Sequence, residues 1–126
     1  MATPENNRRG TILVVEDQCQ IRELTSGVLR DHGYTVLEAA DGLEALEVFT
    51  RRAESVDLLL TDWWMPRMDG GELCRRLSGI HPETRVLVMS GTIDREPRAD
   101  IAFLQKPFTL PRLIRMVDEL LCPCEA

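Results

Sequence analysis

The sequence predicts an α/β protein built on a doubly wound parallel sheet of five strands. Five short apolar segments lie at residues 11–15, 34–37, 56–61, 85–89 and 101–104, and stretches with the apolar spacing of helices follow the first three and the last. A short and nearly continuous apolar run is typical of a strand buried on both faces, as in parallel sheets. Strands that alternate with helices form right-handed crossover units, and these build a parallel sheet.

The first helix is expected over residues 18–32. Its apolar residues recur every three or four positions, and Gly33 follows as a residue suited to end a helix. The four positions expected to face the core are Ile21, Leu24, Val28 and Leu29.

The other helices carry recognisable starts. Asp41 with Glu44, and Asp69 with Glu72, have the spacing of a capping box, in which the first side chain accepts a hydrogen bond from a backbone N–H three residues on. Thr109 is suited to cap the last helix, since a proline follows in the first turn. The residues expected to face the core from these helices are Leu46, Phe49, Leu73, Leu77, Leu113, Val117, Leu120 and Leu121.

The composition is that of one soluble globular domain. Of 126 residues, 44% are hydrophobic and 29% are charged. We expect a flexible N-terminal lead-in at 1–10, the domain at 11–122 and a C-terminal tail at 123–126. The net charge of −6 argues against direct binding to nucleic acid. No apolar run approaches the roughly 20 residues of a membrane span, and no signal peptide opens the chain, so we expect no membrane contact and a cytoplasmic location.

The four cysteines, Cys19, Cys74, Cys122 and Cys124, are interpreted as reduced thiols of an intracellular domain. Cys122 and Cys124 lack a second cysteine or histidine pair at the spacing of a zinc site. We therefore assign them no function.

Polar residues follow the predicted strands at the point where each strand ends. Glu16 and Asp17 follow the first strand, Asp62 the third, Ser90 the fourth and Lys106 the fifth. Parallel strands bring these ends to one edge of the sheet, where ligands bind. Three carboxylates there would repel one another, and Mg²⁺ is a suitable counter-ion because it accepts a few carboxylates and keeps some waters. Mg²⁺, a carboxylate nucleophile and a lysine together indicate a phosphoryl group carried on an aspartate.

Four stretches match a family in order. Residues 14–17, 62–70, 89–91 and 106–108 resemble motifs of the receiver domains of two-component response regulators, and the resemblance runs from about residue 11 to residue 121. It implies a flavodoxin-like sheet with the strand order 2-1-3-4-5. It also implies a phosphoryl donor that is a histidine kinase or a phosphotransfer domain, and a response through an unknown downstream protein.

The resemblance implies roles for the acids at the sheet edge. Asp62 would be the phosphoacceptor. Asp17 and Asp62 would ligate Mg²⁺ through their carboxylates, and Trp64 would do so through its backbone carbonyl. Glu16 would hold a metal-bound water. We expect the side chains of Trp63 and Trp64 to serve only in packing.

The same resemblance implies a switch. Ser90 would move to hydrogen-bond a phosphoryl oxygen, and Lys106 would form an ion pair with the phosphate. Phe103 stands where the family places an aromatic residue that turns inward with that movement. The Lys106–Pro107 peptide bond is expected to be cis, since proline is nearly the only residue that allows it.

One stretch departs from the family pattern. Ser90 and Lys106 are 16 residues apart, which is shorter than the family norm by about one and a half helical turns. The helix between the fourth and fifth strands should be shortened or missing, because residues 92–100 are polar and contain Pro97. Many receivers dimerise through the face that this helix forms with the fifth strand and the last helix. Because the helix should be shortened or missing here, we expect a monomer.

Several interpretations stay open from the sequence. Residues 89–92 and 103–110 resemble receivers at the C-terminus of hybrid sensor histidine kinases, but a free-standing receiver fits equally well. A pseudo-receiver that only binds protein is an alternative, against which the complete acidic set argues. A haloacid-dehalogenase-like phosphatase would need a second aspartate at position 64, where a tryptophan stands. A dinucleotide-binding domain would need a glycine-rich turn that the sequence lacks.

Overall fold

The computed structural model describes residues 10–52, 56–65, 67–91 and 101–121. These residues form a parallel sheet of five strands in the order β2-β1-β3-β4-β5, with helices on both faces. This confirms the predicted fold class and strand order. In chain order the elements are β1 (Thr11–Val15), α2 (Cys19–Asp31), β2 (Thr35–Ala39), α3 (Gly42–Arg52), β3 (Leu58–Asp62), α4 (Gly70–Ile80), β4 (Arg85–Ser90), β5 (Ala102–Gln105) and α5 (Leu110–Leu121).

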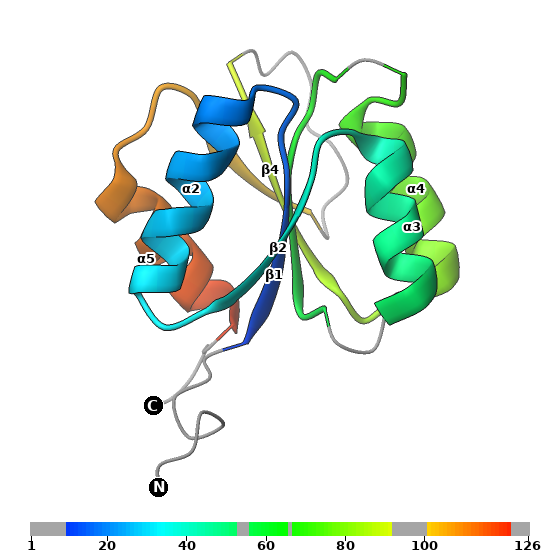
Figure 1. Ribbon diagram of the computed structural model, residues 1–126, viewed down its shortest axis with the longest axis horizontal. Coiled ribbons are helices and arrows are strands. Elements are labelled where there is room, and N and C mark those ends of the chain that lie inside the picture. The colour runs from blue at the N-terminus through cyan, green and yellow to red at the C-terminus, as the bar shows by residue number, and fades with distance from the viewer. Residues whose placement is uncertain (1–9, 53–55, 66, 92–100, 122–126) are drawn as a thin grey trace, which may run out of the picture.

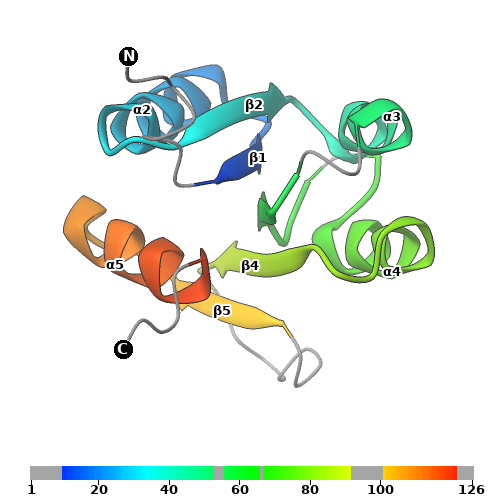
Figure 2. The same ribbon diagram turned by 90° about the horizontal axis from the view of Figure 1, so that it is seen from below.

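In the described part of the chain, the sheet is covered by two helices on each face. Helices α2 and α5 lie on one face, and α3 and α4 lie on the other (Figures 1 and 2). Because side chains alternate along a strand, β1 sends Ile12 and Val14 into the α2/α5 core and Leu13 and Val15 into the α3/α4 core. All of β1 and β3 is buried, as the apolar runs predicted.

Strands β3 and β4 extend one residue further than expected and include Asp62 and Ser90. Both residues are therefore held by the sheet itself, with Asp62 in register with Met89 and Ser90 in register with Gln105. The sheet thus fixes the position of two candidate site residues, which gives them less freedom than a loop would.

The predicted core face of α2 is wrong at two of its four positions and confirmed at Leu29, which is fully buried. Ile21 and Leu24 are 40% and 58% exposed, and the buried residues are Thr25, Ser26 and Leu29. The helical period was correct, but the apolar stripe overlaps the buried stripe only in part, at Leu29. The apolar pattern missed this because the helix buries small hydroxyl residues, which a hydrophobicity pattern does not mark.

The predicted helix starts are confirmed. Asp69 Oδ1 accepts a 2.9 Å hydrogen bond from the Glu72 N–H, and Asp41 Oδ1 accepts one of the same length from the Glu44 N–H. Thr109 Oγ1 accepts from the Arg112 N–H at 3.2 Å. Each bond satisfies a backbone donor that the first turn of a helix leaves without a partner.

Residues 92–100 lie outside the described part of the chain, so the shortened helix and the monomer inferred from it stay predictions. We expect the domain to remain monomeric when saturated with Mg²⁺ and beryllofluoride, a phosphate analogue. A segment this short and polar cannot present the two or more turns that an apolar helix face needs. Light scattering with and without beryllofluoride measures this, and a dimer formed on its addition would contradict it.

The first residue of α4 lies directly on the end of β3. The Gly70 N–H donates to the Trp63 carbonyl at 2.7 Å, and a Cβ atom at Gly70 would lie 2.7 Å from the Asp62 carbonyl oxygen and 2.9 Å from the Trp63 Cα. Both contacts are with backbone, which cannot move aside as a flexible side chain can. The glycine therefore lets α4 approach the candidate phosphoacceptor closely.

We expect Gly70→Ala to lower the free energy of unfolding by roughly 1–3 kcal/mol, because it overpacks this contact. Gly79→Ala is the matched control, since Gly79 lies in the same helix and a Cβ there meets nothing within 4 Å. The control should raise the free energy of unfolding by about 0.5–1 kcal/mol, the usual gain in a helix. Denaturant unfolding measures both variants. Equal changes in their free energies of unfolding would show that the close approach at Gly70 does not affect stability.

Candidate functional site

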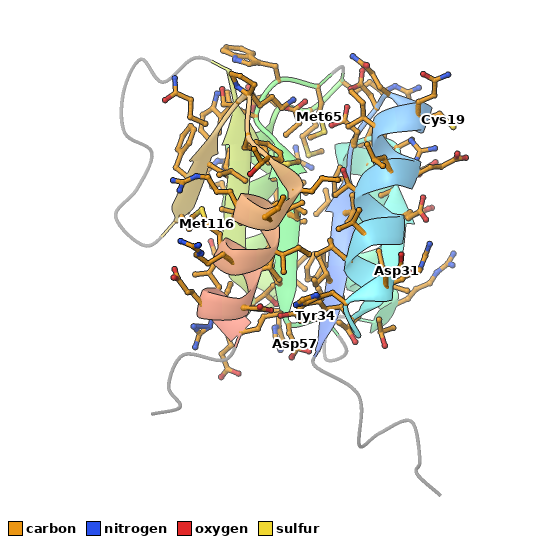
Figure 3. The ribbon with its side chains drawn as sticks, turned by 90° about the vertical axis from the view of Figure 1, so that its left-hand side faces the viewer. Cys19, Asp31, Tyr34, Asp57, Met65 and Met116 are labelled. Atoms are coloured by element: carbon orange, nitrogen blue, oxygen red, sulfur yellow. The ribbon has the colours of Figure 1, made fainter. Side chains whose placement is uncertain are left out.

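Three carboxylates meet at the carboxyl edge of the sheet. Glu16 and Asp17 follow β1, Asp62 ends the neighbouring β3, and one carboxylate oxygen from each lies within 4.8 Å of the others. Glu16 is 2% exposed and Asp62 is 8% exposed, whereas Asp17 is open to solvent. Figure 3 shows this end of the molecule, where Cys19 at the start of α2 and Met65 after β3 lie at the same end. The sequence analysis predicted this grouping from the strand ends.

Glu16 is held by its backbone and by one carboxylate oxygen. Its N–H donates to the Ala39 carbonyl at 3.1 Å, and its Oε2 accepts from the Gln18 N–H at 3.2 Å. Its Oε1 is buried and has no hydrogen-bond partner among the described residues. Burial raises the pKa of Glu16, the negative charges of Asp62 and Asp17 raise it further, and the Gln18 N–H and Lys106 oppose the rise. Ionised Glu16 therefore needs a further positive partner.

These residues fit a divalent cation. Oxygen ligands in a close, partly buried group are what Mg²⁺ prefers, and the buried Oε1 of Glu16 has unused capacity to accept a hydrogen bond from a water. Asp17 is exposed, so this member of the group is accessible to an ion and its waters. The donor set is thus chemically suited to the ion that the sequence predicted.

Lys106, which follows β5, and Ser90, which ends β4, lie at the same edge of the sheet. Lys106 Nζ donates to Asp62 Oδ2 at 3.2 Å, and the Lys106 N–H donates to the Ser90 carbonyl at 2.8 Å. Ser90, the last residue of β4, is fully buried. The Trp63 N–H donates to the Met89 carbonyl at 2.9 Å, which extends the β3–β4 pairing one residue beyond Asp62. The structure therefore brings five predicted site residues, Glu16, Asp17, Asp62, Ser90 and Lys106, to one edge.

The tryptophans after Asp62 behave differently from one another. The ring of Trp63 lies against α4, where a Cβ at Gly71 would lie 2.9 Å from its Cη2 atom. Trp64 is 61% exposed, so the expectation that its side chain packs is wrong. Trp64 stands in the loop beyond the sheet edge, where no helix covers it among the described residues. Its backbone carbonyl as a metal ligand stays a prediction.

Phe103 lies on β5 in register with Val88 of β4 and is half-buried. Its neighbour Leu104 points into the α2/α5 core, so Phe103 faces the opposite side of the sheet. The Lys106–Pro107 peptide bond is cis.

Met68 and Gly42 anchor the loop that carries Trp64, although nothing in the sequence pattern marked them as part of the site. Met68 is 6% exposed, and a Cβ at Gly42 would lie 2.9 Å from the Met68 Cβ. Arg67, with a positive φ of 73°, forms an ion pair of 3.5 Å with Asp41 beside the start of α3. The local signal, a methionine between a charged residue and a helix cap, does not distinguish an anchor from a surface residue.

Together, the doubly wound sheet and the acidic edge with its lysine define a phosphoacceptor signalling domain. The chain belongs to the response regulator receiver domain family, whose model matches residues 12–118.

The chain is similar to curated receiver proteins. It is 40% identical over 117 residues to the sensor kinase CckA of Brucella abortus (strain 2308), covering 88% of this chain and 12% of that protein. It is 34% identical over 116 residues to sporulation initiation phosphotransferase F of Bacillus subtilis (strain 168), covering 87% of this chain and 92% of that protein. The chain thus spans a small part of the first relative and nearly all of the second.

Solved structures agree with this family. The receiver domain of the hybrid histidine kinase CckA is 37% identical, with a TM-score of 0.81, and covers 90% of this chain and all of that one. A receiver domain protein from Clostridium thermocellum is 27% identical, with a TM-score of 0.83, and covers 89% of this chain and 94% of that one. No helix in the part of the chain that the structure describes is long and apolar enough to cross a membrane.

Proposed function

We propose that Asp62 receives a phosphoryl group from a histidine kinase or a phosphotransfer domain, and that the reaction depends on Mg²⁺. The observation that carries this proposal is the contact between Lys106 and Asp62 beside two further carboxylates at the edge of the sheet. A carboxylate held at the end of a buried strand, with one oxygen bound to an ammonium group, is fixed in position for covalent chemistry.

In the proposed reaction a carboxylate oxygen of Asp62 attacks the phosphorus, and the bond from phosphorus to the donor breaks. Lys106, whose ammonium already lies 3.2 Å from Asp62 Oδ2, would balance the negative charge that the phosphoryl group brings. Ser90, buried at the end of the neighbouring strand, would supply a hydroxyl donor to a phosphoryl oxygen. The movement of Ser90 would allow Phe103 to turn inward.

Asp17, Asp62 and the backbone carbonyl of Trp64 would hold Mg²⁺, and Glu16 would act through a water. When bound, the ion would neutralise charge on the phosphoryl oxygens. The chain itself supplies the geometry: β1 and β3 are paired, so the acids that follow β1 and the acid that ends β3 keep a fixed separation.

The experiment that tests this function is mass spectrometry after incubation with acetyl phosphate, a small phosphoryl donor, with Mg²⁺ or with a chelator. We expect the mass of one phosphoryl group to be added only when Mg²⁺ is present, and to be lost slowly as water hydrolyses the acyl phosphate. A domain that gains no mass with Mg²⁺ present would instead be a pseudo-receiver that only binds protein. Rapid turnover of phosphate esters would favour a phosphatase.

The similarity to the CckA receiver supports a place within, or beside, a hybrid histidine kinase. The similarity to a sporulation phosphotransferase supports a free-standing carrier of phosphoryl groups equally well. In both cases the direct partner is a protein that carries phosphohistidine, and the acidic net charge makes nucleic acid an unsuitable direct partner.

A further inference from the structure

Arg22 of α2 contacts the backbone of the acidic edge, although it lies on a helix to which the sequence assigned no function. Its Nη1 donates to the carbonyl oxygen of Glu16 at 2.8 Å, and its Nε lies 3.4 Å from Glu38 Oε1. The side chain is only 19% exposed. One guanidinium therefore joins the end of β1, the first part of α2 and β2.

Arg30, two turns further along the same helix, makes the same kinds of contact elsewhere. Its Nη1 lies 3.1 Å from Glu38 Oε2, and its Nη2 donates to the Val36 carbonyl at 3.0 Å. Both arginines thus pair with Glu38 and both donate to a backbone carbonyl. The difference is that Arg22 binds the carbonyl of a residue in the acidic group, whereas Arg30 binds the carbonyl of Val36, near the start of β2.

With the hydrogen bond from Arg22, both the N–H and the carbonyl of Glu16 have hydrogen-bond partners. The Glu16 N–H is bound to Ala39, its carbonyl is bound to Arg22, and its Oε2 is bound to the N–H of Gln18. Free rotation of this turn would change the separation of the Glu16 and Asp17 carboxylates from Asp62.

We propose that Arg22 is a positioning residue for the cation site: it holds the peptide of Glu16 so that the acids after β1 face Asp62. This inference rests on the proposed Mg²⁺ binding and adds to it a residue that contacts neither the ion nor a phosphoryl group. Partners of this kind orient the groups that bind a metal, and their loss typically weakens metal binding by about 10- to 100-fold.

The direction in which Mg²⁺ affinity changes distinguishes a positioning role of Arg22 from an effect of its charge alone. Removing a positive charge near an acidic site strengthens cation binding by Coulomb's law. Removing a positioning contact weakens cation binding, because the carboxylates lose their fixed geometry. A neutral substitution at Arg22 therefore changes Mg²⁺ affinity in opposite directions under the two explanations.

The test compares Arg22→Gln with Arg30→Gln, which makes the same chemical change on the same helix. Mg²⁺ is titrated while the fluorescence of Trp63 and Trp64, next to Asp62, is followed. Denaturant unfolding is measured separately on each variant. We expect Arg22→Gln to weaken Mg²⁺ binding by about tenfold, whereas Arg30→Gln leaves it unchanged or slightly tighter. If the two variants have equal Mg²⁺ affinities, or if Arg22→Gln binds Mg²⁺ more tightly than wild type, the positioning role is wrong.

Arg22→Lys and Arg30→Lys decide the question if Arg22→Gln fails to fold. Lysine keeps the charge but lacks the planar fork that reaches both the Glu16 carbonyl and Glu38. We expect a smaller loss of Mg²⁺ affinity for Arg22→Lys and none for Arg30→Lys, and equal affinities would overturn the inference. A wild-type domain that binds no Mg²⁺ would overturn the proposed function itself, which distinguishes the two failures.

Discussion

Asp62→Asn is expected to abolish the mass increase that we expect acetyl phosphate and Mg²⁺ to produce in the wild-type domain. The amide has nearly the same shape as the carboxylate, but it is a far weaker nucleophile and cannot form the acyl phosphate. It also removes the negative charge that Lys106 contacts at 3.2 Å. The loss should be complete within detection, because the other two acids at this edge lie after β1 and not at the end of β3, beside Lys106. Intact-protein mass spectrometry measures it.

Asp57→Asn is the matched control for this experiment. Asp57 precedes the same strand at its opposite end (Figure 3), and its Oδ2 accepts a hydrogen bond from the Thr11 N–H, which an asparagine oxygen can also accept. The control should be labelled as fully as wild type. Labelling of Asp62→Asn to the wild-type level would place the phosphoacceptor elsewhere, and loss of labelling in both variants would point to damage to the fold.

The strands and the acidic edge could be predicted from sequence because both follow from short-range patterns. The run from Leu58 to Leu60 is apolar without alternation, which is typical of a short strand buried on both faces. Once the strands are parallel, the residues after them must share an edge, so the grouping of Glu16, Asp17 and Asp62 followed from topology alone.

Other features could not be predicted because they depend on tertiary contacts. Nothing local distinguishes Arg22, which binds the Glu16 carbonyl, from the other arginines of a polar helix surface. Leu24 fits the apolar period of α2 but lies outside its contact with the sheet, where Ser26 is buried instead. Trp64 is large and apolar, yet its side chain is exposed, because it stands in the loop that follows β3.

Glu16 illustrates how a binding site can oppose the stability of the fold around it. The residue is almost fully buried, its Oε1 has no hydrogen-bond partner among the described residues, and Asp62 and Asp17 repel its charge. An ionised carboxylate in this position destabilises the folded state, because in the unfolded chain it would be hydrated and far from the other acids. Such residues are retained for function, and replacing them often stabilises a protein.

Glu16→Gln should therefore raise the free energy of unfolding without Mg²⁺ by about 1 kcal/mol, and should weaken Mg²⁺ binding by about tenfold. The glutamine oxygen can still accept from the Gln18 N–H, and its amide can donate to the neighbouring acids. If the proposed site binds Mg²⁺, saturating Mg²⁺ should stabilise the wild-type domain through ligand binding, so the advantage of the variant should shrink as Mg²⁺ is added. Glu72→Gln is the control of opposite sign, because hydrogen bonds from Arg76 and Arg75 lower the pKa of exposed Glu72 and favour its charged form. Denaturant unfolding across an Mg²⁺ series measures both variants, and a Glu16→Gln domain less stable than wild type without Mg²⁺ would show that the buried charge is already compensated.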